Sequence, residues 1–261
     1  MTFAYQQASS LAAAAEAAAA SEAKIIAGGQ SLLGAIKLGL AAPEALIDLC
    51  GLAELKGIRR DGDHVVIGAM CTHAEVAASS VVQQAIPALA DLAGRIGDRQ
   101  VRNLGTLGGS LANNDPAACY PAAVLGLGAS VQTDRRHIAA DDFFKGMFET
   151  ALAEGEIIVS VSFPIPAKAA WQKFKQPASR FSIVGVFVAK TAAGVRVAVT
   201  GAGPGVFRAT AIEKALDGSW TEAAAAAVSI EADGLNSDLH GSPEYRAALI
   251  PVLAGRAVRA C

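Results

Sequence analysis

Two short loops, each built around a pair of adjacent glycines, contain the residues of this chain best suited to bind an anion. Adjacent glycines have no Cβ and reach positive φ, so successive backbone N–H groups can converge on one negative charge. Hydroxyl side chains accompany both pairs and add further donors. A dinucleotide pyrophosphate carries two negative charges, and two such loops could hold it from both sides. The residues expected to bind it are Ala27, Gly28, Gly29, Gln30, Ser31, Leu32, Thr106, Gly108, Gly109 and Ser110.

The first loop lies between an expected strand and an expected helix. Residues 24–27 form a short apolar run, which predicts a buried strand. After Ser31, apolar residues recur at helical spacing at Leu33, Ile36 and Leu40. A helix N-terminus carries unpaired N–H groups and the positive end of the helix dipole, which favour a bound anion. Taken alone, this arrangement is equally compatible with an ordinary strand-to-helix turn.

The second loop belongs to a longer polar segment, residues 102–116, with the sequence Arg-Asn-Leu-Gly-Thr-Leu-Gly-Gly-Ser-Leu-Ala-Asn-Asn-Asp-Pro. Such a segment is too polar to be buried without a partner, and a polar ligand would satisfy its groups. We expect residues 97–115 to be irregular in structure.

Strands and helices alternate along the rest of the chain, which predicts an α/β or α+β architecture. Strands are expected at 45–49, 64–69, 129–133, 156–163, 169–174, 182–190 and 195–200. Helices are expected at 11–20, 83–96 and 122–127, with alanine-rich helices towards the C-terminus. The spacing of Thr72 and Glu75 matches a capping box and predicts another helix start, so that His73 has a structural role. Pro164 and Pro166 mark the best candidate domain boundary.

Composition excludes several classes of protein. The chain of 261 residues is 52% hydrophobic and 18% charged, so it can bury a large core. A net charge of −2 without a basic run argues against nucleic-acid binding. No apolar run is long enough to cross a bilayer, and no cationic leader precedes an apolar stretch. Four scattered cysteines without a C-x-x-C pair provide no set of metal or iron–sulfur ligands, and they fit a reducing cytoplasm.

A third glycine-rich loop, Gly201–Gly205, follows an expected strand and resembles the first turn of a dinucleotide-binding βαβ unit. Val206 occupies the place of the last glycine of the G-x-G-x-x-G pattern, and Pro204 removes a useful N–H. We interpret this loop as a structural turn. A non-redox nucleotide-binding protein built around it remains a distant alternative.

The Ala-Gly-Gly-Gln-Ser loop, the Arg-Asn-x-Gly-Thr-x-Gly-Gly-Ser segment and Asp115-Pro116 with Pro121 together resemble a known family. It is the FAD-binding medium subunit of molybdenum hydroxylases, the carbon monoxide dehydrogenase and xanthine dehydrogenase superfamily. The resemblance runs nearly end to end. It implies an α+β protein whose residues 1–166 form a two-subdomain FAD-binding fold of the vanillyl-alcohol-oxidase type, split near residue 53. A smaller α/β C-terminal domain would occupy residues 167–261.

The resemblance also implies roles for single residues. The two loops would hold the FAD pyrophosphate, and Asp115 would lie near the adenosine or ribityl part. Lys175 falls where some relatives place a lysine beside the isoalloxazine ring, Ile158 where some place an apolar residue, and Ile96 also borders the cofactor. No catalytic or metal-binding residue is implied. Cys119 departs from the family, because many relatives carry an acidic residue there; we interpret it as a small apolar residue. Some relatives also place an acidic residue just after the arginine matched by Arg180, which this chain lacks.

The function implied is that of an FAD-binding electron-transfer subunit. Its partners would be a small subunit with two [2Fe–2S] clusters and a large subunit with the molybdenum–pterin cofactor, assembled as a dimer of heterotrimers. Electrons would leave for a quinone, NAD or another acceptor. No histidine lies beside either glycine loop, so we expect non-covalent FAD. The alternative is a self-contained flavin oxidoreductase of the same fold, for which Lys175 is the only acid–base candidate.

Overall fold

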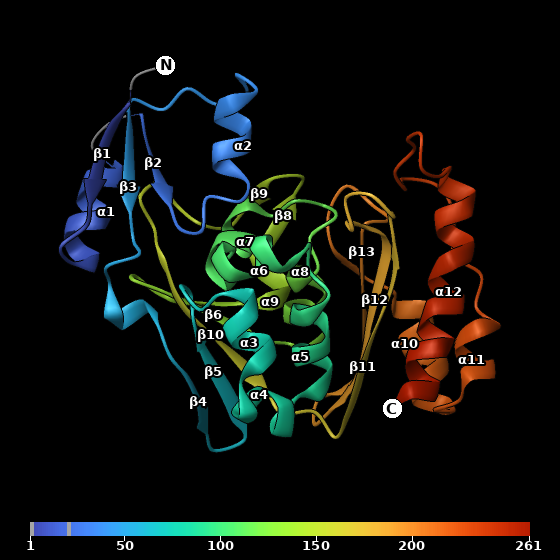
Figure 1. Ribbon diagram of the computed structural model, residues 1–261. Helices are drawn as coiled ribbons and strands as arrows, with labels where there is room; N and C mark the ends of the chain where they lie inside the picture. Colours follow the sequence, from blue (N-terminus) through green and yellow to red (C-terminus); the bar gives the residue numbers. More distant parts are fainter. Residues whose placement is uncertain (1–2, 20–21) are drawn as a thin grey trace.

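The computed structural model describes residues 3–19 and 22–261 (Figure 1). Its strands form a three-stranded, a five-stranded and a four-stranded sheet, together with a two-stranded hairpin. The three larger sheets follow one another along the chain. No helix within the described ranges is both long and apolar enough to cross a lipid bilayer.

The first sheet is parallel, with the order β1 (Ala4–Gln7), β3 (Ala45–Asp48) and β2 (Ala23–Ile26). Helix α1 (Leu11–Ala19) packs against it and buries Ala14 and Ala18. This helix and strands β2 and β3 were expected, although Ala20 lies outside the described residues. The first glycine loop leaves the end of β2 and leads into α2 (Leu32–Lys37), as predicted.

The second sheet is antiparallel, with the order β4-β5-β10-β6-β7. Its strands are β4 (Ile58–Asp61), β5 (His64–Gly68), β10 (Ile158–Pro164), β6 (Ser130–Thr133) and β7 (His137–Ala139). Helices α3 (His73–Ala78), α4 (Ser80–Ala85), α5 (Pro87–Gly94), α6 (Arg99–Leu104), α7 (Leu107–Asn113) and α8 (Tyr120–Leu127) gather beside it (Figure 1). A one-turn helix, α9 (Ala140–Phe143), precedes the hairpin of β8 (Phe144–Gly146) and β9 (Glu149–Thr150). A short 3-10 turn, η1 (Ala53–Leu55), joins the first two sheets.

Two expectations for this region were wrong. Residues 83–96 form parts of two helices, because Pro87 starts a new helix at the position where its missing N–H costs nothing. Residues 97–115 are largely helical instead of irregular. Asp98 and Thr106 cap α6 and α7 by accepting hydrogen bonds from the N–H groups of Val101 and Gly109. Each cap pairs a backbone N–H group at the start of its helix, so a polar, glycine-rich segment can form helices despite its composition.

The third sheet lies between the central helices and the C-terminal helices (Figure 1). It is antiparallel and contains β11 (Lys168–Lys175), β12 (Ser182–Thr191), β13 (Gly194–Thr200) and β14 (Phe207–Arg208). Phe187 and Ala189 face the central core, whereas Val186 and Val188 face the C-terminal helices. Both faces of β12 are buried, which explains its nearly continuous apolar sequence. The helices are α10 (Thr210–Gly218), α11 (Glu222–Ala226) and α12 (Pro243–Ala260).

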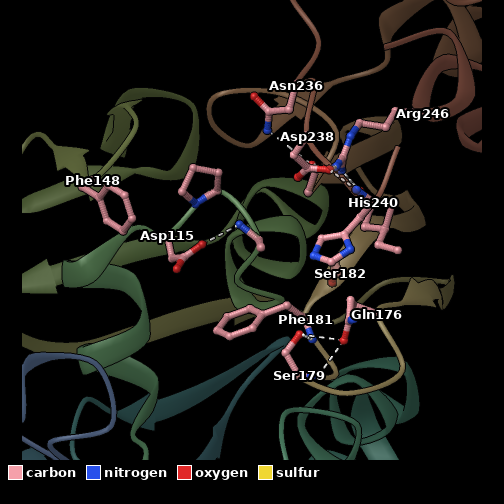
Figure 2. A pocket seen from close by; sticks show the side chains of 14 residues that line it. Asp115, Phe148, Gln176, Ser179, Phe181, Ser182, Asn236, Asp238, His240 and Arg246 are labelled. Carbon is pink, nitrogen blue, oxygen red and sulfur yellow. Dashed lines mark hydrogen bonds and ion pairs between the residues drawn. The ribbon is translucent and has the colours of Figure 1, made fainter. Parts of the chain in front are cut away.

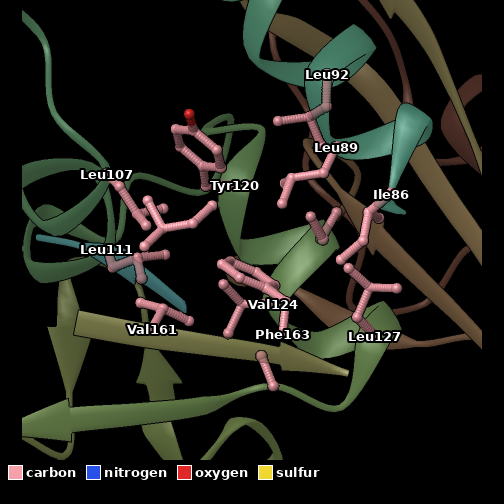
Figure 3. Packing of buried hydrophobic residues seen from close by; sticks show 14 of the residues in the cluster. Ile86, Leu89, Leu92, Leu107, Leu111, Tyr120, Val124, Leu127, Val161 and Phe163 are labelled. Carbon is pink, nitrogen blue, oxygen red and sulfur yellow. The ribbon is translucent and has the colours of Figure 1, made fainter. Parts of the chain in front are cut away.

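The largest core lies between the second sheet and helices α5, α7 and α8 (Figure 3). Leu89, Leu111 and Val124 are fully buried there, with Phe163 of β10 beneath them. The helix that carries the second glycine loop therefore has one face anchored in the core, and its N-terminus is held in place.

One buried carboxylate stabilises the edge of the second sheet. Glu156 accepts hydrogen bonds from the Thr133 hydroxyl at 2.8 Å, the Ala153 N–H at 2.8 Å, and Nε and Nη2 of Arg136 at 2.9 and 2.8 Å. The hydrogen bond from Arg136, followed by those from the backbone and Thr133, outweighs burial and lowers the pKa of Glu156 to about 2. The carboxylate thus joins the β6–β7 turn to the segment that precedes β10.

We predict that Glu156→Gln lowers the free energy of unfolding at pH 7 by about 2–3 kcal/mol. The folded pKa lies below the ordinary value of 4.5, so this stabilisation is present above pH 4.5 and is lost as the pH falls towards about 2. Urea unfolding at pH 7, 5, 4 and 3 should show the variant and the wild type converging in acid. Asp91→Asn, which removes an exposed ion pair with Arg95, is the control and should change little. A pH-independent difference would contradict the assignment.

Candidate functional site: two glycine loops and a cavity

The two glycine loops, far apart in the sequence, pack against each other. A Cβ added to Gly28 would lie 2.0 Å from the carbonyl oxygen of Leu104 and 2.8 Å from the Cα of Gly105. A Cβ added to Gly109 would lie 3.6 Å from the Cβ of Ala27. Only glycine at position 28 permits this contact between backbones. The tertiary structure therefore brings the two predicted anion-binding segments together.

The first loop presents unpaired backbone donors. From Gly28 to Leu32, no N–H group donates a hydrogen bond to any described part of the chain. Gly29 has a φ of +69°, which turns the backbone sharply before α2. The hydroxyl of Ser31, at the N-cap of α2, makes no capping bond. A run of free N–H groups with a free hydroxyl is what an oxyanion of a ligand would satisfy.

The second loop uses most of its backbone donors internally. The N–H groups of Leu107 and Gly108 donate to the carbonyls of Cys71 and Ala69, and those of Gly109 and Ser110 donate to the hydroxyl and carbonyl of Thr106. The expectation that this loop holds a pyrophosphate through several N–H groups therefore needs correction, because α7 begins there and consumes them. The loop contributes the free hydroxyl of Ser110 and the surface that Gly109 leaves clear beside Ala27.

His73 packs against the second loop at Gly105. The predicted capping box is confirmed: the Thr72 hydroxyl accepts from the N–H of Glu75, and the Glu75 carboxylate accepts from the N–H of Thr72. The N–H of His73 donates to the carbonyl of Gly105 at 2.9 Å, and a Cβ on Gly105 would lie 2.6 Å from the imidazole Nε2. Burial, followed by the charge of Arg102, lowers the pKa of His73 to about 4, so the ring is neutral at physiological pH.

A cavity of about 350 Å³ lies beyond the C-terminal end of α7 (Figure 2). This volume falls within the roughly 300–1,000 Å³ typical of small-ligand sites. Helix α7 has 7 residues and is therefore about 10 Å long. The cavity joins Asp115, which was predicted to contact the cofactor, to the β11–β12 loop and to a C-terminal loop bearing Asn236, Asp238 and His240. These last three residues were missed by the sequence analysis, because nothing in the sequence connects them to the glycine loops.

Backbone strain is concentrated around this cavity. Asn114, Phe148 and Arg180 are the non-glycine residues with positive φ in the described part of the chain, at +42°, +56° and +63°. Phe148 lines the cavity, and the other two are sequence neighbours of lining residues. Such conformations cost on the order of 1–3 kcal/mol each and persist where the surrounding structure imposes them, often at ligand sites. The sequence gives no signal for this feature.

The C-terminal wall of the cavity is held by a buried arginine. Arg246 of α12 donates to the carbonyls of Ile183 at 2.6 Å and Gly201 at 2.9 Å, and to the Asp238 carboxylate at 2.7 Å. Gly201 has a φ of +81°, and a Cβ there would lie 2.5 Å from the carbonyl of Ser182. These contacts support the interpretation of the third glycine loop as a structural turn. The third glycine loop also borders a second cavity of about 500 Å³.

Cys119 lies directly behind the cavity wall. Its Sγ accepts a hydrogen bond from Nζ of Lys173 at 3.2 Å and lies 3.6 Å from Oγ of Ser182, which lines the cavity. The thiol is buried. The interpretation of Cys119 as an ordinary apolar residue therefore needs correction, since a lysine ammonium is directed at its sulfur.

Three further predicted residues border this region without lining the cavity. Ile158 is buried in β10. The carbonyl of the next residue, Val159, accepts a hydrogen bond from the N–H of Ala69, and the carbonyl of Ala69 in turn accepts from the N–H of Gly108. Lys175 is exposed at the end of β11, next to the cavity residue Gln176. Ile96 packs against the central core. Their contacts with a cofactor remain predictions.

Comparison with known proteins identifies the family. Residues 1–166 match the FAD-binding domain in molybdopterin dehydrogenase. The chain belongs to this family. Residues 169–261 match the CO dehydrogenase flavoprotein C-terminal domain. The resemblance and the α+β fold class inferred from the sequence are thereby confirmed. FAD is the cofactor of this molybdopterin dehydrogenase flavoprotein, which is a component of an oxidoreductase.

Similar proteins cover almost the whole chain. The carbon monoxide dehydrogenase medium chain of Hydrogenophaga pseudoflava is 36% identical over 258 residues, which span 92% of this chain and 89% of the relative. The nicotine 6-hydroxylase medium subunit of Paenarthrobacter nicotinovorans is 38% identical over 251 residues, 91% of this chain and 89% of the relative. Among solved structures, quinoline 2-oxidoreductase from Pseudomonas putida 86 superposes with a TM-score of 0.91 at 30% identity, covering 100% and 96% of the two chains.

The residues present in this flavoprotein fit FAD. Free N–H groups from Gly28 to Leu32 suit the negatively charged pyrophosphate, and the space beside Gly109 and Ala27 would be filled by any side chain at position 109. Helix α7 separates this point from the cavity by about 10 Å, which an extended dinucleotide can span. The cavity itself offers both polar and aromatic walls for a flat heterocyclic ring.

Proposed function

We propose that this chain is the electron-transfer subunit of a three-component molybdenum hydroxylase or dehydrogenase. It would receive electrons from [2Fe–2S] clusters on a small partner and pass them to an external acceptor such as a quinone or NAD. A large partner would carry the molybdenum–pterin cofactor and oxidise the substrate, and two heterotrimers would pair. Support comes from relatives named as medium chains and medium subunits of dehydrogenases and hydroxylases. When bound, FAD allows electrons that arrive one at a time to be passed on in pairs.

The observation that carries this proposal is the meeting of the two glycine loops at one end of α7, with the cavity at the other. We place the pyrophosphate between the loops, where the unpaired N–H groups from Gly28 to Leu32 and the hydroxyls of Ser31 and Ser110 would bind it. The flavin ring then occupies the cavity next to Asp115. Lys175 and Ile158 would border the cofactor at its edges. The roles of this chain's residues are to bind and orient the cofactor and to exclude water from it.

We also propose the boundaries and location of the protein. The chain passes from the first sheet to the second between residues 48 and 58, and from the second to the third between residues 164 and 168. This supports an FAD-binding domain of residues 1–166, split near residue 53, and a C-terminal domain of residues 167–261. The cysteines Cys50, Cys71, Cys119 and Cys261 are all unbridged, which supports a cytoplasmic location.

The test is purification of the chain alone and with its natural partners, followed by absorbance spectra before and after acid denaturation. We expect a flavin spectrum whose chromophore is released by acid as free FAD. Iron–sulfur absorbance should appear only in the co-purified complex. A flavin-containing chain that purifies without partners and oxidises a substrate itself would instead favour a self-contained oxidoreductase. A chain that stays colourless after incubation with FAD would overturn the proposal.

A further inference from the structure

Phe148 occupies an unusual position at the edge of the cavity. It stands in the turn between β8 and β9, with a φ of +56° that bulky side chains rarely adopt. The residue is 58% exposed although it lines the cavity. A strained backbone that presents an uncovered aromatic ring to a cavity gains nothing for the folded chain alone. A ligand that covers the ring would account for both features.

Asn114 imposes this conformation. Its side-chain amide donates to the carbonyls of Gly146 at 2.9 Å and Glu149 at 2.8 Å, and its own carbonyl accepts from the N–H of Phe148 at 3.1 Å. Asn114 is itself 1% exposed, at the left-handed C-cap of α7, and so cannot reach a ligand in the cavity. Three hydrogen bonds therefore attach the hairpin turn to the end of the helix that begins at the second glycine loop.

A second aromatic ring borders the same cavity from another segment. Phe181, in the β11–β12 loop, is 50% exposed and lines the cavity (Figure 2). Its neighbour Arg180 has a φ of +63° and donates from Nη1 to the carbonyl of Gly97 at 3.2 Å. Two uncovered phenyl rings on independently strained turns, with Asp115 in the same wall, describe a site for a planar aromatic ring with polar edges.

We propose that Phe148 packs against the isoalloxazine ring of the cofactor and that Asn114 is the positioning residue that holds Phe148 in place. This inference rests on the proposed location of the flavin ring in the cavity. It divides the cofactor site into two parts. The glycine loops bind the pyrophosphate, whereas the Asn114-anchored hairpin binds the ring and selects for a flavin over other dinucleotides.

The test separates these two parts with fragments of the cofactor. Apo-protein of the full chain is titrated with FMN, which contains the ring, and with ADP, which contains the pyrophosphate without the ring. Phe148→Gly should raise the Kd for FMN at least about tenfold and leave the Kd for ADP unchanged. Glycine accepts a positive φ without strain, so this variant should be as thermally stable as the wild type or more so. Met147→Gly, at a 54% exposed neighbour outside the cavity wall, is the matched control.

Asn114→Gly tests the positioning role, since glycine retains the left-handed cap but removes the two amide hydrogen bonds. We expect the same loss of FMN affinity with ADP binding preserved. The double variant Asn114→Gly with Phe148→Gly should bind FMN no more weakly than Phe148→Gly alone, because Asn114 acts only through Phe148. A purely structural role for Asn114 would instead weaken both ligands.

The outcomes distinguish the two levels of the proposal. If the wild-type apo-protein binds neither FAD nor FMN, the proposed function fails. If it binds both and Phe148→Gly retains wild-type affinity for FMN, the ring contact is overturned while the proposed function stands. Loss of FMN affinity in Phe148→Gly with equal loss of ADP affinity would also overturn the assignment, because the effect would then not belong to the ring.

Discussion

Replacing Gly109 with valine is expected to abolish FAD binding while leaving the chain folded. A Cβ at this position would lie 2.9 Å from Oγ1 of Thr106 and 3.6 Å from the Cβ of Ala27. The two γ-methyl groups of valine would extend into the space between the glycine loops that we assign to the pyrophosphate. We expect the Kd for FAD to rise at least about a hundredfold, equivalent to about 3 kcal/mol. Disturbing the Thr106 cap should cost about 1 kcal/mol of stability.

Flavin content after purification and titration of apo-protein with FAD would measure this effect, and thermal unfolding would report the folded state. Gly203→Val is the control, since a Cβ there would make only ordinary contacts, with the ring of Phe207 at 3.4 Å and the carbonyl oxygen of Gly205 at 3.5 Å, and the residue borders the other cavity. That variant should keep its flavin. Normal flavin content in Gly109→Val would remove the pyrophosphate from between the loops and contradict the proposed site.

The largest loss of stability is expected from Arg246→Met. The buried guanidinium donates to the carbonyls of Ile183 and Gly201 and pairs with Asp238, so methionine removes a charged donor from two carbonyls and from one carboxylate. Removing one partner from a buried charge pair typically costs about 3–5 kcal/mol. Because Asp238 is half-exposed and can regain water, we expect about 3 kcal/mol. The melting temperature should fall by about 6–12 °C.

Arg259→Met is the matched control for this experiment. Arg259 lies on the same helix, and its ion pair with Glu222 at 3.3 Å is largely exposed. Such surface pairs contribute about 0–1 kcal/mol. Equal melting temperatures for the two variants would show that the C-terminal wall of the cavity does not depend on Arg246.

The sequence alone was sufficient for the parts of this protein that depend on neighbouring residues. The first glycine pair, the capping box at Thr72 and the strands β11, β12 and β13 are local patterns, and the structure places each of them where the pattern predicts. The order of the two glycine motifs was also specific enough to indicate the family. The two wrong predictions of secondary structure also have local causes, namely helix caps and a helix-starting proline. The caps at Asp98 and Thr106 turn a polar segment into two helices, and Pro87 divides one expected helix into two.

Only the tertiary structure decided how these parts form a site. The contact of Gly28 with Leu104 depends on packing between segments that are distant in the chain, and no periodicity encodes it. The same packing showed that the N–H groups of the second loop are already paired within α7 and its neighbours. It also brought Asn236, Asp238 and His240 to the cavity next to Asp115. The sequence alone determined which residues could bind a dinucleotide, because that chemistry belongs to residue types and their spacing. Which donors remain free, and which walls face them, depended on the folded backbone, because pairing and burial are properties of contacts across the chain.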